Sequence, residues 1–417
     1  MRLNSENAES GPGDRPAESI GPSVSSRPRW APWGGAAEPL SRQQFNERYN
    51  LAYQAPDTPR ASVLQVTKHY LASVVVYGCL LLFVTQNPWF KMLLEVSFKE
   101  TTAGQIYGLL FKAYGYLAFP VLLITRPRSL WCSKNLLILG YLGRLLARPF
   151  RHDARPARPD YRESQALMFL LIKLIYGPLM LHAVFLELER LPGFWFRLKL
   201  QSDWLTKLDI WYLLFISTIF LVDSSVFFFG YTSEAGWLGN RLRYCETDVF
   251  RILVCVACYE PFNLVTGHIA GASYGHFGIL YDRDLEHPMT WVLRGLAVLF
   301  LLLMISTSLS LFTRASNLTN RGIVKHGPYA LVRHPGYLAK NMFWLMTIIP
   351  LFVPDTEALD FSWSAHALVC VGAAMGWLAW ASLYFLRAIT EEQFLSKDPE
   401  YVAYCQKVRY RFIPGVY

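Results

Sequence analysis

Long apolar blocks dominate this chain of 417 residues, and each block is about as long as a segment that crosses a bilayer. A helix rises about 1.5 Å per residue, so about 20 apolar residues cover a hydrocarbon core of about 30 Å. The sequence therefore predicts an all-α, polytopic transmembrane helical bundle of about eight spans. The candidate spans are residues 70–90, 104–125, 166–188, 209–230, 249–272, 291–312, 337–353 and 363–386.

The charged residues lie mostly between these blocks. They make up 17% of the chain, against about a quarter in a typical soluble domain. The net charge of +9 indicates membrane topology rather than nucleic-acid binding, because Lys and Arg accumulate in cytoplasmic loops. No nucleic-acid partner is expected. The charge distribution places both termini in the cytoplasm, at the inner membrane of a bacterium or the endoplasmic reticulum of a eukaryote.

Three regions follow from the spacing of the blocks. Residues 1–65 are rich in Ser, Pro, Gly and Arg, which predicts a disordered cytoplasmic tail, with a short interfacial helix near residues 40–53. Residues 66–290 form an N-terminal membrane region of about five spans, interrupted by an amphipathic basic loop at 126–165. Residues 291–417 form a membrane core with a cytoplasmic C-terminal tail.

Five charged residues lie inside predicted spans, where burying a charge costs free energy. They are Lys112, Lys173, Asp223, Glu260 and Arg294. Asp223 and Glu260 either pair with a cation on another helix or line a substrate cavity, and the sequence leaves both open. The seven Cys and nine His residues show no zinc-ligand spacing, so no metal site is predicted.

A charged turn precedes the seventh block, in the segment LVRHPGYL at residues 331–338. Pro335 suits the first turn of a helix, because its missing N–H is not needed there. The residue before a proline avoids helical geometry, so Arg333 and His334 are predicted to lie outside the helix. They then sit beside its N-terminus, which favours anions.

A second polar group follows the last block. Glu391 and Glu392 lie about one helical turn beyond the predicted bilayer edge, and Tyr401 and Tyr404 share a helix face. The two groups flank one helical hairpin and carry opposite charges, which suits a zwitterionic ligand. The alternative is an inter-helix salt bridge with a belt of interfacial aromatic residues.

These motifs resemble those of the isoprenylcysteine carboxyl methyltransferase family, which includes phospholipid methyltransferase relatives. The resemblance covers about residues 320–417. The shared elements are G-P-Y at 327–329, R-H-P-x-Y at 333–337, E-E at 391–392, Y-x-x-Y at 401–404 and R-x-I-P at 411–414. Ala339 stands where many members have glycine.

The resemblance implies an integral membrane enzyme that uses S-adenosylmethionine without a dinucleotide-binding domain, and the chain has no G-x-G-x-x-G. The cofactor-binding residues it implies are His326, Gly327, Tyr329, His334, Pro335, Tyr337, Glu391, Glu392 and Tyr401. The catalytic candidates are Arg333, His334 and Glu260.

The expected reaction is methyl transfer to a lipophilic or amphipathic acceptor. The expected partners are a lipophilic small molecule or lipid-like substrate and the membrane lipids around the protein. A carboxylate acceptor needs no base, whereas a thiol, amine or hydroxyl must lose a proton to Glu260, Asp223 or His334. Two other functions remain open. One is an NADPH-dependent membrane reductase of the sterol or steroid type, and the other is a non-enzymatic membrane sensor or transporter.

Overall fold

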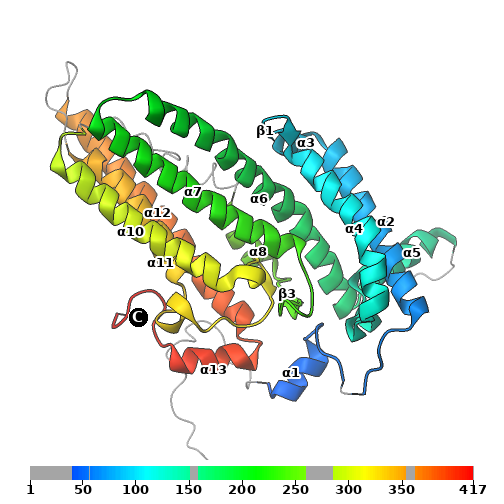
Figure 1. The fold of residues 1–417 in the computed structure, drawn as a ribbon. Coiled ribbons are helices and arrows are strands. Elements are labelled where there is room, and N and C mark those ends of the chain that lie inside the picture. The colour runs from blue at the N-terminus through cyan, green and yellow to red at the C-terminus, as the bar shows by residue number, and fades with distance from the viewer. Residues whose placement is uncertain (1–39, 56, 151–157, 260–284, 354–361, 417) are drawn as a thin grey trace, which may run out of the picture. The chain divides into compact units, whose positions relative to one another are not determined.

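The described part of the computed structural model comprises residues 40–55, 57–150, 158–259, 285–353 and 362–416 (Figure 1). Most of the predicted N-terminal tail lies outside it, and so does Glu260. The described end of that tail contains helix α1 (Arg42–Arg48), whose Phe45 is buried against Tyr244 and Phe394.

Six helices in the described part are long and apolar enough to cross a membrane. Large apolar side chains such as Leu82, Leu117 and Leu378 are exposed on them, which suits lipid rather than water. The prediction of an all-α polytopic membrane protein is confirmed. The helices are α2 (Val63–Gln86), α4 (Ala103–Thr125), α6 (Tyr161–Leu200), α7 (Trp204–Thr232), α10 (Pro288–Leu311) and α12 (Trp363–Leu395).

The other two predicted spans are not full-length helices in the described part. Helix α8 (Val249–Val256) has eight residues, and most of the rest of that predicted span lies outside the described residues. Helix α11 (Pro335–Ile348) has 14 residues and continues as the short 3₁₀ helix η6 (Ile349–Phe352). Fourteen residues cover about 21 Å, which is less than the hydrocarbon core.

Two apolar cores hold the helices together. In the first, α6 packs on α7 through residues that include Phe169, Tyr176 and Tyr231. In the second, α10 packs between α7 and α11 through residues that include Leu301 and Phe343. Ala339 is fully buried in this second core, so its side chain contributes to helix packing.

The short elements occupy the connections between these helices. They are α3 (Pro88–Leu94), β1 (Ser97–Phe98), β2 (Thr101–Thr102), η1 (Arg128–Cys132), α5 (Lys134–Ala147), η2 (Arg148–Phe150), β3 (Tyr244–Cys245), η4 (Phe312–Arg314), β4 (Thr319–Asn320), η5 (Gly327–Ala330) and α13 (Pro399–Lys407). Helix α5 lies in the predicted basic loop.

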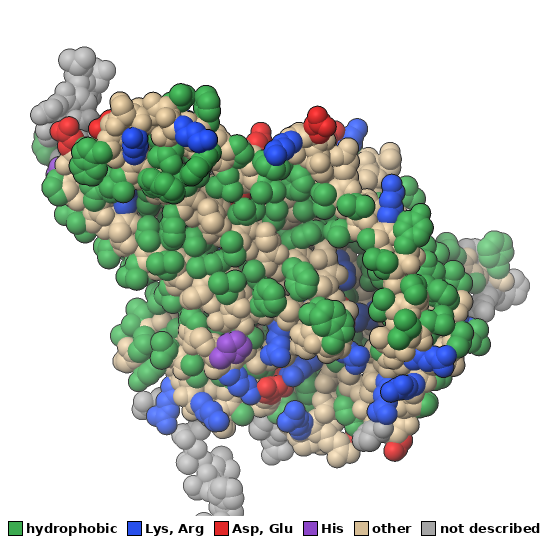
Figure 2. All heavy atoms as spheres, viewed as in Figure 1, with side chains coloured by type: hydrophobic (Ala, Val, Ile, Leu, Met, Phe, Trp, Pro, Cys, Tyr) green, Lys and Arg blue, Asp and Glu red, His purple; other side chains and the backbone are tan. Residues whose placement is uncertain are grey.

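Several distant segments meet at one end of the bundle, here called the α13 end. Strands β3 and β4 pair antiparallel with Tyr244 opposite Asn320. Asp398 caps α13 and accepts hydrogen bonds from Arg243 at 2.6 Å and from Asn320 at 2.9 Å. Lys and Arg side chains gather along the same edge of the molecule (Figure 2).

Two of the charged groups inside the spanning helices, Arg294 and Asp223, have polar partners. Arg294 on α10 pairs with Asp209 on α7 at 2.6 Å, and its guanidinium lies 4.9 Å from the Tyr212 ring centroid. Asp223 on α7 accepts a hydrogen bond from the Ser308 hydroxyl of α10. Arg294 is therefore paired with a carboxylate on a neighbouring helix. Asp223 is bonded to a neutral hydroxyl rather than to a cation.

Glu234, just after α7, links this connection to α5. Its carboxylate accepts hydrogen bonds from the Lys134 ammonium at 2.7 Å and from the Leu242 backbone N–H at 3.1 Å. Burial alone raises the pKa of Glu234. The charges of Lys134, Lys173 and Arg321 outweigh burial and lower the pKa from 4.5 to about 2.

This lowered pKa makes part of the stability pH-dependent. A carboxyl whose folded pKa lies below its unfolded value stabilises the fold above the unfolded pKa, and this stabilisation disappears as the pH falls through the folded pKa. We expect Glu234→Gln to be less stable than the wild type at neutral pH, with the difference shrinking between pH 4.5 and about pH 2. Thermal unfolding in detergent measures this, with the exposed Glu47→Gln as the control. A difference independent of pH would contradict the assignment.

Candidate functional site

The candidate site lies at the α13 end, where α11 begins and α12 ends. Pro335 is the first residue of α11, and His334 precedes it with φ −127° and ψ 58°, outside helical geometry, as the proline predicts. The turn is held by the C-terminal segment. The backbone N–H of Arg333 donates to the Tyr410 carbonyl at 3.0 Å, and that of His334 donates to the Arg411 carbonyl at 2.9 Å.

Glu392 is the centre of a buried ion cluster. Its Oε1 accepts hydrogen bonds from Arg333 Nε at 2.8 Å and from Arg411 Nε at 3.0 Å, and its Oε2 accepts from Arg411 Nη2 at 2.7 Å. His334 Nε2 lies 3.2 Å from Oε1. None of these four side chains is more than 6% exposed. Glu392 thus joins α12, the turn before α11 and the C-terminal segment.

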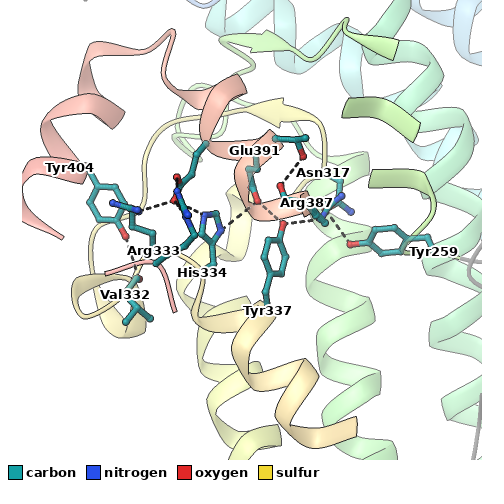
Figure 3. Close-up of polar contacts among 12 residues, drawn as sticks. Tyr259, Asn317, Val332, Arg333, His334, Tyr337, Arg387, Glu391 and Tyr404 are labelled. Atoms are coloured by element: carbon teal, nitrogen blue, oxygen red, sulfur yellow. Dashed lines mark hydrogen bonds and ion pairs between the residues drawn. The ribbon is translucent and has the colours of Figure 1, made fainter. Parts of the chain in front are cut away.

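Glu391 has a different environment although it is the neighbouring residue. Its side chain is 38% exposed. Oε2 accepts a hydrogen bond from the Tyr337 hydroxyl at 2.5 Å and lies 3.7 Å from His334 Nδ1. The His334 ring stacks on the Tyr337 ring at 5.3 Å between centroids (Figure 3). Glu391 therefore keeps access to solvent or a ligand, whereas Glu392 does not.

Arg387 is a site residue that the sequence analysis missed. It is buried, its Nε donates to the Tyr337 hydroxyl at 2.8 Å, and its Nη2 donates to Asn317 Oδ1 at 2.7 Å. Its guanidinium lies 5.7 Å from the Tyr259 ring centroid (Figure 3). The available signal was its position four residues before Glu391, which places both on one face of α12.

A small pocket of about 30 Å³ opens beside Glu391. Arg387, Glu391 and Thr390 of α12 line it together with Glu246 and Cys255. Its lining includes two carboxylates and two arginines, Arg251 and Arg387, so both signs of charge are present within one small space.

The remaining predicted site residues lie around η5 and α13. His326 and Gly327 are exposed, and Gly327 has φ +61°, where a Cβ would lie 2.4 Å from the Ser310 hydroxyl oxygen. The Tyr329 carbonyl accepts a hydrogen bond from the Tyr404 hydroxyl at 2.7 Å. Tyr401 is 3% exposed and packs in an apolar cluster with Tyr404. Among the described residues that the sequence predicts for the site, only Glu391 lines the pocket. The others do not: His326, Gly327, Tyr329, Arg333, His334, Pro335, Tyr337, Glu392 and Tyr401.

The salt-bridge alternative accounts for Glu392, and the ligand alternative remains a prediction for Glu391. Glu392 forms the buried inter-element salt bridge, and Glu391 faces the pocket with aromatic and cationic neighbours. The residues that the structure describes contain no group of three or more His, Cys, Asp or Glu able to hold a metal ion.

Similarity to known proteins adds nothing to this geometry. No protein-family model, no curated protein and no solved structure matches the chain, so the chemistry of the site is argued from its residues.

Proposed function

We propose that this chain is an integral membrane methyltransferase that uses S-adenosylmethionine and acts on a lipophilic or amphipathic acceptor. The single observation that carries the proposal is the convergence of Glu391, Tyr337 and His334, three residues of the family motifs, at one end of the α11–α12 hairpin. His334 and Tyr337 lie more than fifty residues before Glu391 in the sequence, and the Glu391 side chain is 38% exposed.

The donor set around Glu391 suits the methionine end of the cofactor. The ammonium and the sulfonium are cations, which a carboxylate and aromatic ring faces attract. The Arg387 guanidinium is a suitable donor for the cofactor carboxylate, and Tyr337 and Tyr259 supply the aromatic faces. A pocket of about 30 Å³ has room for about one water molecule, so the surrounding side chains must move apart for the cofactor to enter.

When bound, the cofactor supplies an electrophilic methyl group, and the protein contributes position and a dry environment. Arg333 and Arg411 hold Glu392, and this cluster fixes the backbone of the turn that carries His334 and Tyr337. A carboxylate acceptor needs no base. For a thiol, amine or hydroxyl acceptor, His334 is the described group nearest Glu391 able to accept a proton.

The proposed orientation puts the α13 end in the cytoplasm. The basic residues gathered there support this, because Lys and Arg are enriched in cytoplasmic loops (Figure 2). Both termini are then cytoplasmic, and the acceptor reaches the site from the membrane.

Binding measurements test this function against its rivals. We expect the protein purified in detergent to bind S-adenosylmethionine and to transfer a labelled methyl group into a membrane lipid extract. A reductase would instead oxidise NADPH in the presence of a sterol. Failure of both reactions, together with no binding of S-adenosylmethionine, would leave a sensor or transporter.

A further inference from the structure

A second and larger pocket lies at the α13 end, with a volume of about 310 Å³. Four arginines and two glycines line it together with Ala52, and no carboxylate of the described residues does. They are Arg241, Arg243, Arg314, Arg321, Gly236 and Gly239. Four guanidinium groups around one pocket repel one another unless anions are close.

Arg321 brings buried N–H donors to the wall of the pocket. This side chain is 3% exposed, and its Nη1 donates to the Ser233 carbonyl at 3.0 Å. Its Nε and Nη2 have no hydrogen-bond partner within the described residues. Leaving buried charged donors unsatisfied is costly, so an acceptor in the pocket would be strongly favoured.

The nearby carboxylates already have partners, and two of them pair with Arg243 of the pocket itself. Arg243 donates to Asp398 at 2.6 Å and to Glu400 at 2.8 Å, and Glu400 also pairs with Lys325. Glu234 is the carboxylate whose charge acts on Arg321, and it already accepts a hydrogen bond from Lys134. Arg241 and Arg314 therefore add positive charge that these carboxylates do not neutralise.

Missing side chains let the guanidinium groups approach the pocket backbone. Gly322 has φ +109°, and a Cβ there would lie 3.4 Å from Arg243 Nη2 and 3.5 Å from Arg314 Nη1. At Gly236 a Cβ would lie 2.4 Å from Arg241 Nη2. A side chain at Gly236 would displace the Arg241 guanidinium, whereas at Gly322 the positive φ is what favours glycine.

We propose that this pocket binds a phosphate group, carried either by a lipid headgroup or by a soluble phosphate compound. Guanidinium forks match the oxygens of a phosphate, and a multiply charged anion uses several of them at once. The pocket is separate from the one at Glu391. Arg243 and Arg321 of this pocket flank one end of the β3–β4 pair, and Glu246 and Leu318 of the pocket at Glu391 flank the other end. The two ends are three residues apart along a strand, which is about 10 Å at about 3.3 Å per residue. The inference does not depend on methyl transfer.

The test uses the full chain with two charge-matched double variants. Arg241→Gln/Arg314→Gln removes two pocket arginines, of which Arg314 donates to the Gly239 carbonyl at 3.2 Å, and keeps Arg243 and Arg321. Arg42→Gln/Arg409→Gln removes two exposed arginines outside the pocket. The first probe is inorganic pyrophosphate, titrated onto protein in detergent. The second is the thermal stability of protein in nanodiscs of phosphatidylcholine, with and without phosphatidic acid.

We expect the pocket variant to weaken the response to a phosphate probe by about tenfold or more, the change that about 1.4 kcal/mol produces. We expect the control variant to retain wild-type binding. A response to pyrophosphate identifies a soluble ligand, and a response to phosphatidic acid alone identifies a lipid headgroup. Equal losses in both variants would show non-specific attraction, and no response to either probe would show that no phosphate site exists. Either result overturns the proposal.

Discussion

Replacing Glu391 by glutamine is expected to weaken binding of S-adenosylmethionine about 10- to 100-fold, because one charge-assisted hydrogen bond contributes about 1.5–3 kcal/mol. Glutamine keeps the size of the side chain and an oxygen that accepts the hydrogen bond from the Tyr337 hydroxyl, but it removes the negative charge. The fold should tolerate this change, because the Glu391 side chain is 38% exposed.

Calorimetric titration of the purified variant measures the affinity, and thermal unfolding of the same sample measures stability. Glu47→Gln on α1 removes the same charge from an exposed position away from the pocket and should bind like the wild type. Unchanged cofactor affinity in Glu391→Gln would remove Glu391 from the cofactor site.

Replacing Glu392 by alanine is expected to have a different effect, a loss of about 3–5 kcal/mol of stability, which is typical when one partner of a buried ion pair is removed. The change leaves Arg333 and Arg411 buried without their carboxylate, and it frees the turn before α11 from α12. We therefore expect a lower unfolding temperature and a low yield of folded protein after extraction from the membrane with detergent, whatever the cofactor affinity.

Glu391→Ala is the matched control, since it removes the adjacent carboxylate and breaks only one short hydrogen bond in the described part of the site, the one from Tyr337. It should unfold near the wild-type temperature. If Glu392→Ala unfolds like Glu391→Ala, then the buried cluster does not stabilise the protein, and Glu392 returns as a candidate ligand group.

The sequence predicted the fold class because membrane spans depend on local composition. A run of about 20 apolar residues is sufficient to identify a helix that crosses a bilayer. The prediction was less accurate for residues 337–353, where α11 ends at Ile348 and Pro350 lies in the short 3₁₀ helix η6. Apolar composition alone does not distinguish a spanning helix from a shorter one packed against α10.

The sequence also predicted that the turn at Arg333 and His334 would meet the glutamate pair, and Arg333 Nε lies 2.8 Å from Glu392. It did not show which glutamate is buried. Neighbouring helical residues point about 100° apart, so burial depends on which face of α12 meets the turn. Arg411 reaches Glu392 through backbone pairing with His334, a long-range contact that residue spacing alone does not reveal.

The pairing of residues 410–411 with the turn before α11 has a consequence for how the protein is made. Ribosomes synthesise a chain from its N-terminus, so Arg411 emerges only after the six spanning helices of the described part have been made. Until then Glu392 lacks one of its two guanidinium partners, because Arg333 is already made and Arg411 is not. Synthesis that stops within α13 would give a product whose helices are inserted but whose Glu392 cluster lacks Arg411. Membrane quality-control proteases would then have a structural difference by which to distinguish it from the longer chain.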